Sequence, residues 1–167
     1  DLAMYRAKSS GKARSSVYDD SLHDAAMKRL KLETELRNAV NADQFLLHYQ
    51  PIVSLSTGEA AGFEALLRWQ RTPTELVYPG DFVHVLEDTG GILDVGLWAM
   101  REACRAIKRW NDMCGMAPPM TMSVNVSAKQ FAQPDIVSSI QGIIEESGVA
   151  AHMIRLEIME SIAMDDA

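Results

Sequence analysis

The fold class of this chain is decided by residues 120–159, where two short apolar strands flank a helix. The first strand reads MTMSVNV over residues 120–126, and its apolar and polar side chains alternate. A helical pattern opens at Pro134, carries isoleucines on one face and stops at Gly148. A second strand reads MIRLEIM over residues 153–159. This order and spacing are typical of a right-handed βαβ unit, so the chain belongs to the α/β class with parallel strands.

Further elements are predicted upstream of this unit. Apolar residues four apart, with charges between them, predict an amphipathic connecting helix over residues 21–41. Residues 45–55, FLLHYQPIVSL, are rich in aromatic and β-branched residues and predict a strand, which Pro51 assigns to a sheet edge or a bulge. A short helix ending at Asp88 and a longer one over about residues 93–111 follow.

The segment from Glu59 to Trp69 is ambiguous by local rules. Its alanine, glutamate, leucine and arginine content favours a helix. A strand that starts after the turn at Gly58 would instead form a hairpin with the preceding strand. Local propensity alone favours the helix.

Composition restricts the class of protein and its partners. The chain has 167 residues, of which 47% are hydrophobic and 23% charged, as in ordinary globular domains, and this argues against disorder throughout. The formal net charge is −7. Nucleic acids and anionic membrane surfaces reward a basic face, so we expect no nucleic-acid polymer as a partner.

The termini and the cysteines indicate a compartment. No apolar run is long enough to span a membrane, and the start of the chain lacks the features of a signal peptide. The absence of an initiator methionine suggests a piece of a longer protein. Cys104 and Cys114 have no metal-ligand spacing, and Cys104 lies on the apolar face of its predicted helix. We expect a cytoplasmic domain; whether the parent protein is tethered to a membrane stays open.

Three oxygen-bearing side chains, Glu64, Asn125 and Glu157, lie at or near strand ends, where ligands bind in α/β folds. Carboxylate and amide oxygens suit Mg²⁺ or Mn²⁺. Each of these residues taken alone is more often a solvated or capping group than a metal ligand. Arg68 follows Glu64 by four residues: on a strand the pair shares one face about 13 Å apart, whereas on a helix it forms an ordinary salt bridge.

Several motifs together resemble one known family. LHYQPIV over residues 47–53 and EALLRW over residues 64–69 resemble the opening hairpin and signature of EAL domains, bacterial phosphodiesterases of cyclic diguanylate (cyclic di-GMP). NVS over residues 125–127, with Gln130, resembles the second motif block of that family, and LEIMES over residues 156–161 resembles the third. The blocks occur in the family's order and extend over most of the chain.

The resemblance implies a domain organisation and a fold. Residues 1–20 resemble the C-terminal tail of a GGDEF diguanylate cyclase domain. Residues 21–41 would then be a connecting helix, and residues 42–167 the N-terminal half of an EAL domain. The implied fold is the N-terminal part of a TIM-like (β/α) barrel with an antiparallel first strand, which assigns Glu64 to a strand in spite of the helical propensity around it.

The resemblance also implies site residues and a reaction. Glu64, Asn125 and Glu157 would bind Mg²⁺ or Mn²⁺. A second group, consisting of Gln50, Leu67 and Arg68, would contact the substrate, with Arg68 on a phosphate. Glu160 would brace a mobile loop near the metal. The implied activity is metal-dependent hydrolysis of cyclic di-GMP to linear diguanylate in a bacterial signalling protein, and a homodimer through the EAL domain is expected.

The chain differs from the family pattern at two positions and covers about half of a typical EAL domain. Met159 replaces a usual threonine and His84 a usual proline. The later acidic, lysine, glutamate and glutamine residues of the family's site are absent from this chain. We therefore expect the chain by itself to lack hydrolytic activity, and a half-barrel with uncovered strand edges to be unstable or to associate. The alternative function is a non-catalytic EAL domain that acts as a cyclic di-GMP receptor or regulatory module.

Overall fold

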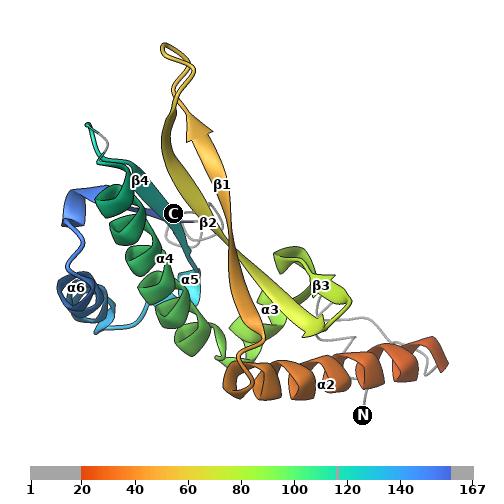
Figure 1. Cartoon of the computed structure of the whole chain (residues 1–167). Helices are drawn as coiled ribbons and strands as arrows, with labels where there is room; N and C mark the ends of the chain where they lie inside the picture. The colour runs from red at the N-terminus through yellow and green to blue at the C-terminus, as the bar shows by residue number, and fades with distance from the viewer. Residues whose placement is uncertain (1–19, 116, 159–167) are drawn as a thin grey trace, which may run out of the picture.

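The computed structural model describes residues 20–115 and 117–158 (Figure 1). In chain order its elements are α2 (Asp20–Asn41), β1 (Phe45–Val53), β2 (Ala60–Thr72), β3 (Glu75–Val77), α3 (Pro79–Thr89), α4 (Ile92–Cys114), β4 (Thr121–Val126), α5 (Ala128–Phe131), α6 (Ile136–Ser147), a 3₁₀ turn η1 (Ala151–Met153) and β5 (Ile154–Ile158). Met159, Glu160 and residues 1–19 of the predicted GGDEF tail (residues 1–20) lie outside the described residues.

The strands form one mixed sheet in the order β1-β2-β4-β5, with β3 paired to β2. β1 and β2 form a long antiparallel hairpin, whereas β2, β4 and β5 run parallel (Figure 1). The parallel pairing of β4 and β5 around α6 confirms the predicted βαβ order. Pro51 lies on β1, at an edge of the sheet, as its missing N–H requires.

The segment around Glu64 is a strand because it pairs with β1 on one side and with β4 on the other. Residues 60–72 form β2, so the helical propensity of this stretch is overridden by tertiary contacts. Gly62 lies so close to β4 that a Cβ atom there would be 2.5 Å from the carbonyl oxygen of Thr121. The absence of a side chain at Gly62 therefore permits β2 to approach β4 directly.

The core has two parts. The first packs α4 and α6 against β4 and the middle of β2, and it includes Cys104, Met122 and Val124. The second packs α2 and α3 against the end of β2 around Trp69 and Phe82. Leu36 and Ala39 of α2 are buried in this second cluster. The predicted helix 21–41 is confirmed, and its C-terminal half is part of the packed structure rather than only a connection.

Three short elements, β3, α5 and the 3₁₀ turn η1, were not predicted. β3 has three residues, too few to show a period of two, and it is specified by its pairing with β2. α5 follows β4 directly and begins with a reciprocal cap between Ser127 and Gln130. Its Ser-x-x-Gln pattern is a recognisable helix start in the sequence. α6 begins at Ile136, two residues later than the expected start at Pro134.

The outer edge of β5 has no partner strand within the part of the chain that the structure describes. Leu156 and Ile158 on this strand are 46% and 47% exposed. A groove lined by apolar residues of α6 and by Leu156 runs beside them. The described sheet is therefore open at the edge of β5.

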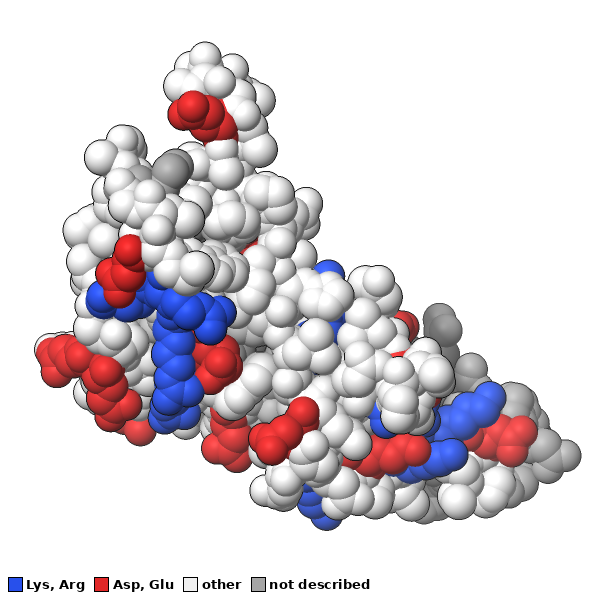
Figure 2. Space-filling model, viewed as in Figure 1, with Lys and Arg blue, Asp and Glu red and all other residues white. Residues whose placement is uncertain are grey.

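Surface charge is mixed. On the face shown in Figure 2, Lys and Arg lie interspersed with Asp and Glu over the helices, while the projecting end of the β1–β2 hairpin carries little charge. Arg71 of β2 pairs with Glu35 of α2 at 2.7 Å, and Arg29 of α2 with Asp88 of α3 at 2.6 Å. None of the described helices is both long and apolar enough to cross a membrane.

The two cysteines differ in environment, which leads to a first prediction. Cys104 is buried, and burial raises the pKa of its thiol, whereas Cys114 is exposed. We expect one of the two thiols to react with an aromatic disulfide reagent at pH 8 in the native protein, and the second only after unfolding. Cys114→Ser should remove the native reaction; rapid reaction of two thiols in native protein would contradict the burial of Cys104.

Candidate functional site

Four polar side chains form a row across one face of the sheet. Gln50 of β1 pairs with Glu64 of β2, Glu64 pairs with Ser123 of β4, and Asn125 of β4 pairs with Glu157 of β5. Paired residues and residues two apart share a face of a sheet. The neighbours Ala65 and Val124 point the other way, into the core beneath α4. The row of Gln50, Glu64, Asn125 and Glu157 therefore lies on the face away from α4.

Two members of this row are in direct contact. The amide Nδ2 of Asn125 donates a hydrogen bond of 2.8 Å to Oε1 of Glu64, across 61 residues of sequence. Among the described residues, no three His, Cys, Asp or Glu side chains are grouped as a metal site. A cation in this row would thus need the amide oxygen of Asn125 as a donor beside the carboxylates of Glu64 and Glu157. Such an all-oxygen set fits Mg²⁺ or Mn²⁺.

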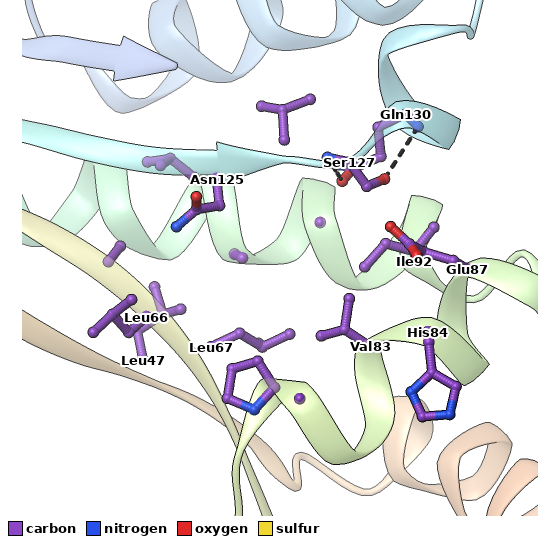
Figure 3. Close-up of a pocket in the computed structure, with 17 residues that line it drawn as sticks. Leu47, Leu66, Leu67, Val83, His84, Glu87, Ile92, Asn125, Ser127 and Gln130 are labelled. Carbon is purple, nitrogen blue, oxygen red and sulfur yellow. Dashed lines mark hydrogen bonds between the residues drawn. The ribbon is translucent and has the colours of Figure 1, made fainter. Parts of the chain in front are cut away.

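The end of β4 is fixed by the cap that follows Asn125. The backbone N–H of Ser127 donates to Oε1 of Gln130 at 3.1 Å, and the N–H of Gln130 donates to the Ser127 hydroxyl at 3.3 Å, as the dashed lines of Figure 3 show. Both side chains are buried. Gly96 of α4 lies against Gln130 so closely that a Cβ atom would overlap its amide group. α4 and α5 together therefore hold the backbone just beyond Asn125.

Substitution of Gly96 tests this packing. Gly96→Ala should lower the free energy of unfolding by about 1–3 kcal/mol, because the new methyl group displaces the buried Gln130 side chain. Gly142→Ala is the matched control: Gly142 also lies within a helix, but its Cβ position is open. There we expect a gain of about 0.5–1 kcal/mol. Urea denaturation measures both; equal behaviour of the two variants would contradict the close approach of Gly96 and Gln130.

Arg68 lies on the same face as Glu64, four residues further along β2. Its Nη1 donates to the carbonyl oxygen of Leu67 at 2.8 Å. Its Nε is buried and has no hydrogen-bond partner among the residues that the structure describes. The guanidinium carbon lies 4.7 Å from the centre of the Tyr78 ring. The side chain is thus held in place while part of its hydrogen-bonding capacity stays unused.

Leu67 belongs to the other face of β2. It pairs with Leu47 and packs against the second core cluster, whereas Leu66 shares the face of Glu64 and Arg68. Both leucines line a pocket of about 490 Å³ between β2, β4, α3 and α4. Figure 3 shows Leu67 extending from β2 toward this space. Leu67 therefore lies on the opposite face of the sheet from Gln50 and Arg68, the residues with which the family resemblance grouped it.

The pocket adjoins the polar row at Asn125, which is part of its wall. Its surface is mostly apolar. His84 and Glu87 of α3 add polar groups, so the position where a proline was expected contributes to the pocket instead. The sequence did not single out Tyr78 or Gly96, and it placed Ser127 and Gln130 in a family motif without identifying them as a helix cap. Of these features, only the cap has a pattern that is recognisable without a structure.

Comparison with known sequences gives the family. The EAL domain profile matches residues 33–167. The chain belongs to the EAL domain family. The match begins within α2, whose C-terminal half the structure packs against α3 and β2. The division of the chain at residue 42 and the cyclase tail over residues 1–20 stay predictions.

Relatives of this EAL domain include signalling proteins of known activity. It is 39% identical over 168 residues to the bifunctional diguanylate cyclase/cyclic di-GMP phosphodiesterase MucR of Pseudomonas aeruginosa, covering 100% of this chain and 24% of MucR. It is 31% identical to the cyclic di-GMP phosphodiesterase PdeR of Escherichia coli, covering 99% of this chain and 24% of PdeR. The chain thus spans about a quarter of the length of these relatives.

Solved structures agree with the fold. The PaMucR phosphodiesterase in complex with c-di-GMP is 38% identical, with a TM-score of 0.75 over 81% of this chain and 54% of that chain. The EAL enzyme Bd1971, in a form with cAMP and cyclic di-GMP bound, is 32% identical, with a TM-score of 0.76 over 98% of this chain and 43% of that one. The mixed sheet with an antiparallel β1–β2 pair is therefore the arrangement of EAL domain structures.

Proposed function

We propose that this EAL domain is part of a bacterial signalling protein that hydrolyses cyclic di-GMP to linear diguanylate in a metal-dependent reaction. The observation that carries the proposal is the row of Gln50, Glu64, Asn125 and Glu157, with its 2.8 Å contact between Glu64 and Asn125. The activity of MucR and PdeR and the ligand of the PaMucR structure supply the substrate class.

Glu64, Asn125 and Glu157 would hold Mg²⁺ or Mn²⁺. The Asn125 amide now donates its N–H to Glu64, so it would turn to present its carbonyl oxygen to a cation. The cap at Ser127 and Gln130 keeps the strand end in place while the side chain turns. When bound, a divalent ion lowers the pKa of a coordinated water and offsets charge on a phosphoryl oxygen.

Arg68 would bind a substrate phosphate, since it lies on the face of the row and its hydrogen bond to Leu67 uses only one of its Nη donors. Gln50 lies directly opposite Glu64 and would contact the substrate from the other side. Leu67 would contribute through the apolar wall of the pocket rather than from the face of Arg68. Glu160, which follows β5, would brace a loop near the metal.

The described sheet would be the first part of a TIM-like barrel, continued by strands that pair with the free edge of β5. In that arrangement the remaining ligands come from the rest of the barrel, and a homodimer forms through the complete EAL domain. The 167-residue chain would then hold only half of a two-metal site and be inactive by itself.

The test compares the intact parent protein with the 167-residue chain in a chromatographic assay for linear diguanylate. We expect Mg²⁺- or Mn²⁺-dependent product from the parent and none from the chain. Turnover by the 167-residue chain alone would contradict the proposal that it holds only half of a two-metal site. Calorimetric binding of cyclic di-GMP without any product from the parent would favour the receptor alternative, and the absence of binding would exclude both functions.

A further inference from the structure

The environment of Arg68 differs from that of the other arginine on β2. Arg71 is paired with the carboxylates of Glu35 and Glu75 at 2.7 and 3.1 Å. Arg68 has no carboxylate partner within the described part of the chain; it lies over the ring of Tyr78, 4.7 Å from the ring centre. A guanidinium within about 6 Å of a ring face is attracted by the negative face of the ring.

Two features of the fold bring Tyr78 to this position. Val77 of β3 pairs with Trp69 of β2 in antiparallel register, so the next residue, Tyr78, comes alongside Arg68. Pro79 follows and disfavours a helical backbone at the residue before it. Tyr78 accordingly has an extended backbone, with φ −93° and ψ 156°, immediately before α3.

A ring and a carboxylate would hold an arginine with different consequences. A carboxylate neutralises the guanidinium and occupies its N–H donors, whereas an aromatic ring contacts the face of the plane and leaves the donors at its edge. The Nη1 of Arg68 donates one hydrogen bond to the Leu67 carbonyl oxygen at 2.8 Å, and the buried Nε has no partner among the described residues. The contact with Tyr78 thus fixes the plane and preserves the charge.

We propose that Tyr78 is a positioning residue for Arg68: its ring orients the guanidinium so that N–H groups at the Nη end face an anionic phosphodiester. The inference rests on the proposed function, in which Arg68 binds the substrate phosphate. Tyr78 itself acts only through Arg68. Tyr78 is 56% exposed, so it contributes little to the core, and its replacement should leave the fold intact.

The first experiment observes Arg68 without any ligand. In protein labelled with ¹⁵N-arginine, the Nε–H resonance of Arg68, assigned by its loss in Arg68→Lys, should be shifted upfield by the ring above it. Tyr78→Phe should keep this shift, because the ring remains. Tyr78→Leu and, as a second truncation, Tyr78→Met should lose it. Phe131→Leu is the matched control, since Phe131 is a similarly exposed aromatic residue on α5, at 53%.

The second experiment measures binding of cyclic di-GMP to the intact parent protein by calorimetry in the presence of Mg²⁺. Tyr78→Leu should bind about three- to tenfold more weakly than the unaltered protein, and Tyr78→Phe within twofold of it. An unchanged Arg68 resonance in folded Tyr78→Leu, or unchanged affinity in a protein that binds, would overturn the proposal. If the unaltered protein binds no cyclic di-GMP, the proposed function fails, and the Arg68 resonance alone decides the positioning role.

Discussion

Replacement of Glu64 by glutamine is expected to lower metal-dependent hydrolysis of cyclic di-GMP by the intact parent protein about 100-fold or more. The substitution removes the negative charge of a proposed metal ligand but keeps the size of the side chain. It also keeps an oxygen that can accept the hydrogen bond from Asn125, which is 2.8 Å long. The fold should therefore survive, and the loss should appear in metal affinity and turnover together.

The matched control for this change is Glu59→Gln. Glu59 lies exposed at the turn of the same β1–β2 hairpin, five residues from Glu64. The control removes the same charge and should leave turnover within about twofold, because solvent and salt screen a charge at that distance. Steady-state assays at several Mg²⁺ concentrations measure both variants. Unchanged turnover in Glu64→Gln would exclude Glu64 as a metal ligand.

Replacement of Trp69 by alanine is expected to lower the free energy of unfolding by about 3–5 kcal/mol. Trp69 is only 1% exposed and lies at the centre of the cluster that joins α2 and α3 to β2. Its ring meets that of Phe82 edge-on at 5.9 Å, and its indole N–H donates to Oε1 of Gln44 at 3.1 Å. The variant would leave a cavity and an unpaired Gln44 side chain in the turn between α2 and β1.

Urea denaturation followed by circular dichroism measures this effect. Phe131→Ala removes an exposed ring and should change the stability by no more than about 0.5 kcal/mol. Hydrogen exchange adds a local readout: amides in the C-terminal half of α2 should exchange faster in Trp69→Ala, since α2 packs on this cluster. Equal denaturation midpoints for the two variants would show that α2 is held in another way.

Local sequence patterns predicted most of the elements and failed where the signal was short or contradictory. The alternation in residues 120–126 and the helical period over residues 21–41 were sufficient for β4 and α2, because each pattern repeats over several residues. β3 has too few residues to repeat a pattern, and the propensity of residues 59–69 favoured a helix that the structure does not contain.

For the candidate site, residue identity alone specifies which side chains are available. Residue identity provides two carboxylates (Glu64 and Glu157), an amide (Asn125) and a guanidinium (Arg68). The motifs that contain these residues indicated the EAL family, and the comparison confirmed it. The same motifs grouped Leu67 with Arg68. The alternation of side chains along β2 separates them, since residues next to each other on a strand point to opposite faces.

The arrangement of these groups follows from strand register and from the packing of distant segments. The row from Gln50 to Glu157 depends on the register of three strand pairs, and the contacts of Arg68 with Tyr78 and of Gly96 with Gln130 depend on how β3 and α5 pack. Local patterns contain no information on such contacts, because register and packing are set by the fit of segments far apart in the chain. The sequence determined the chemistry of this protein, and long-range pairing decided its geometry.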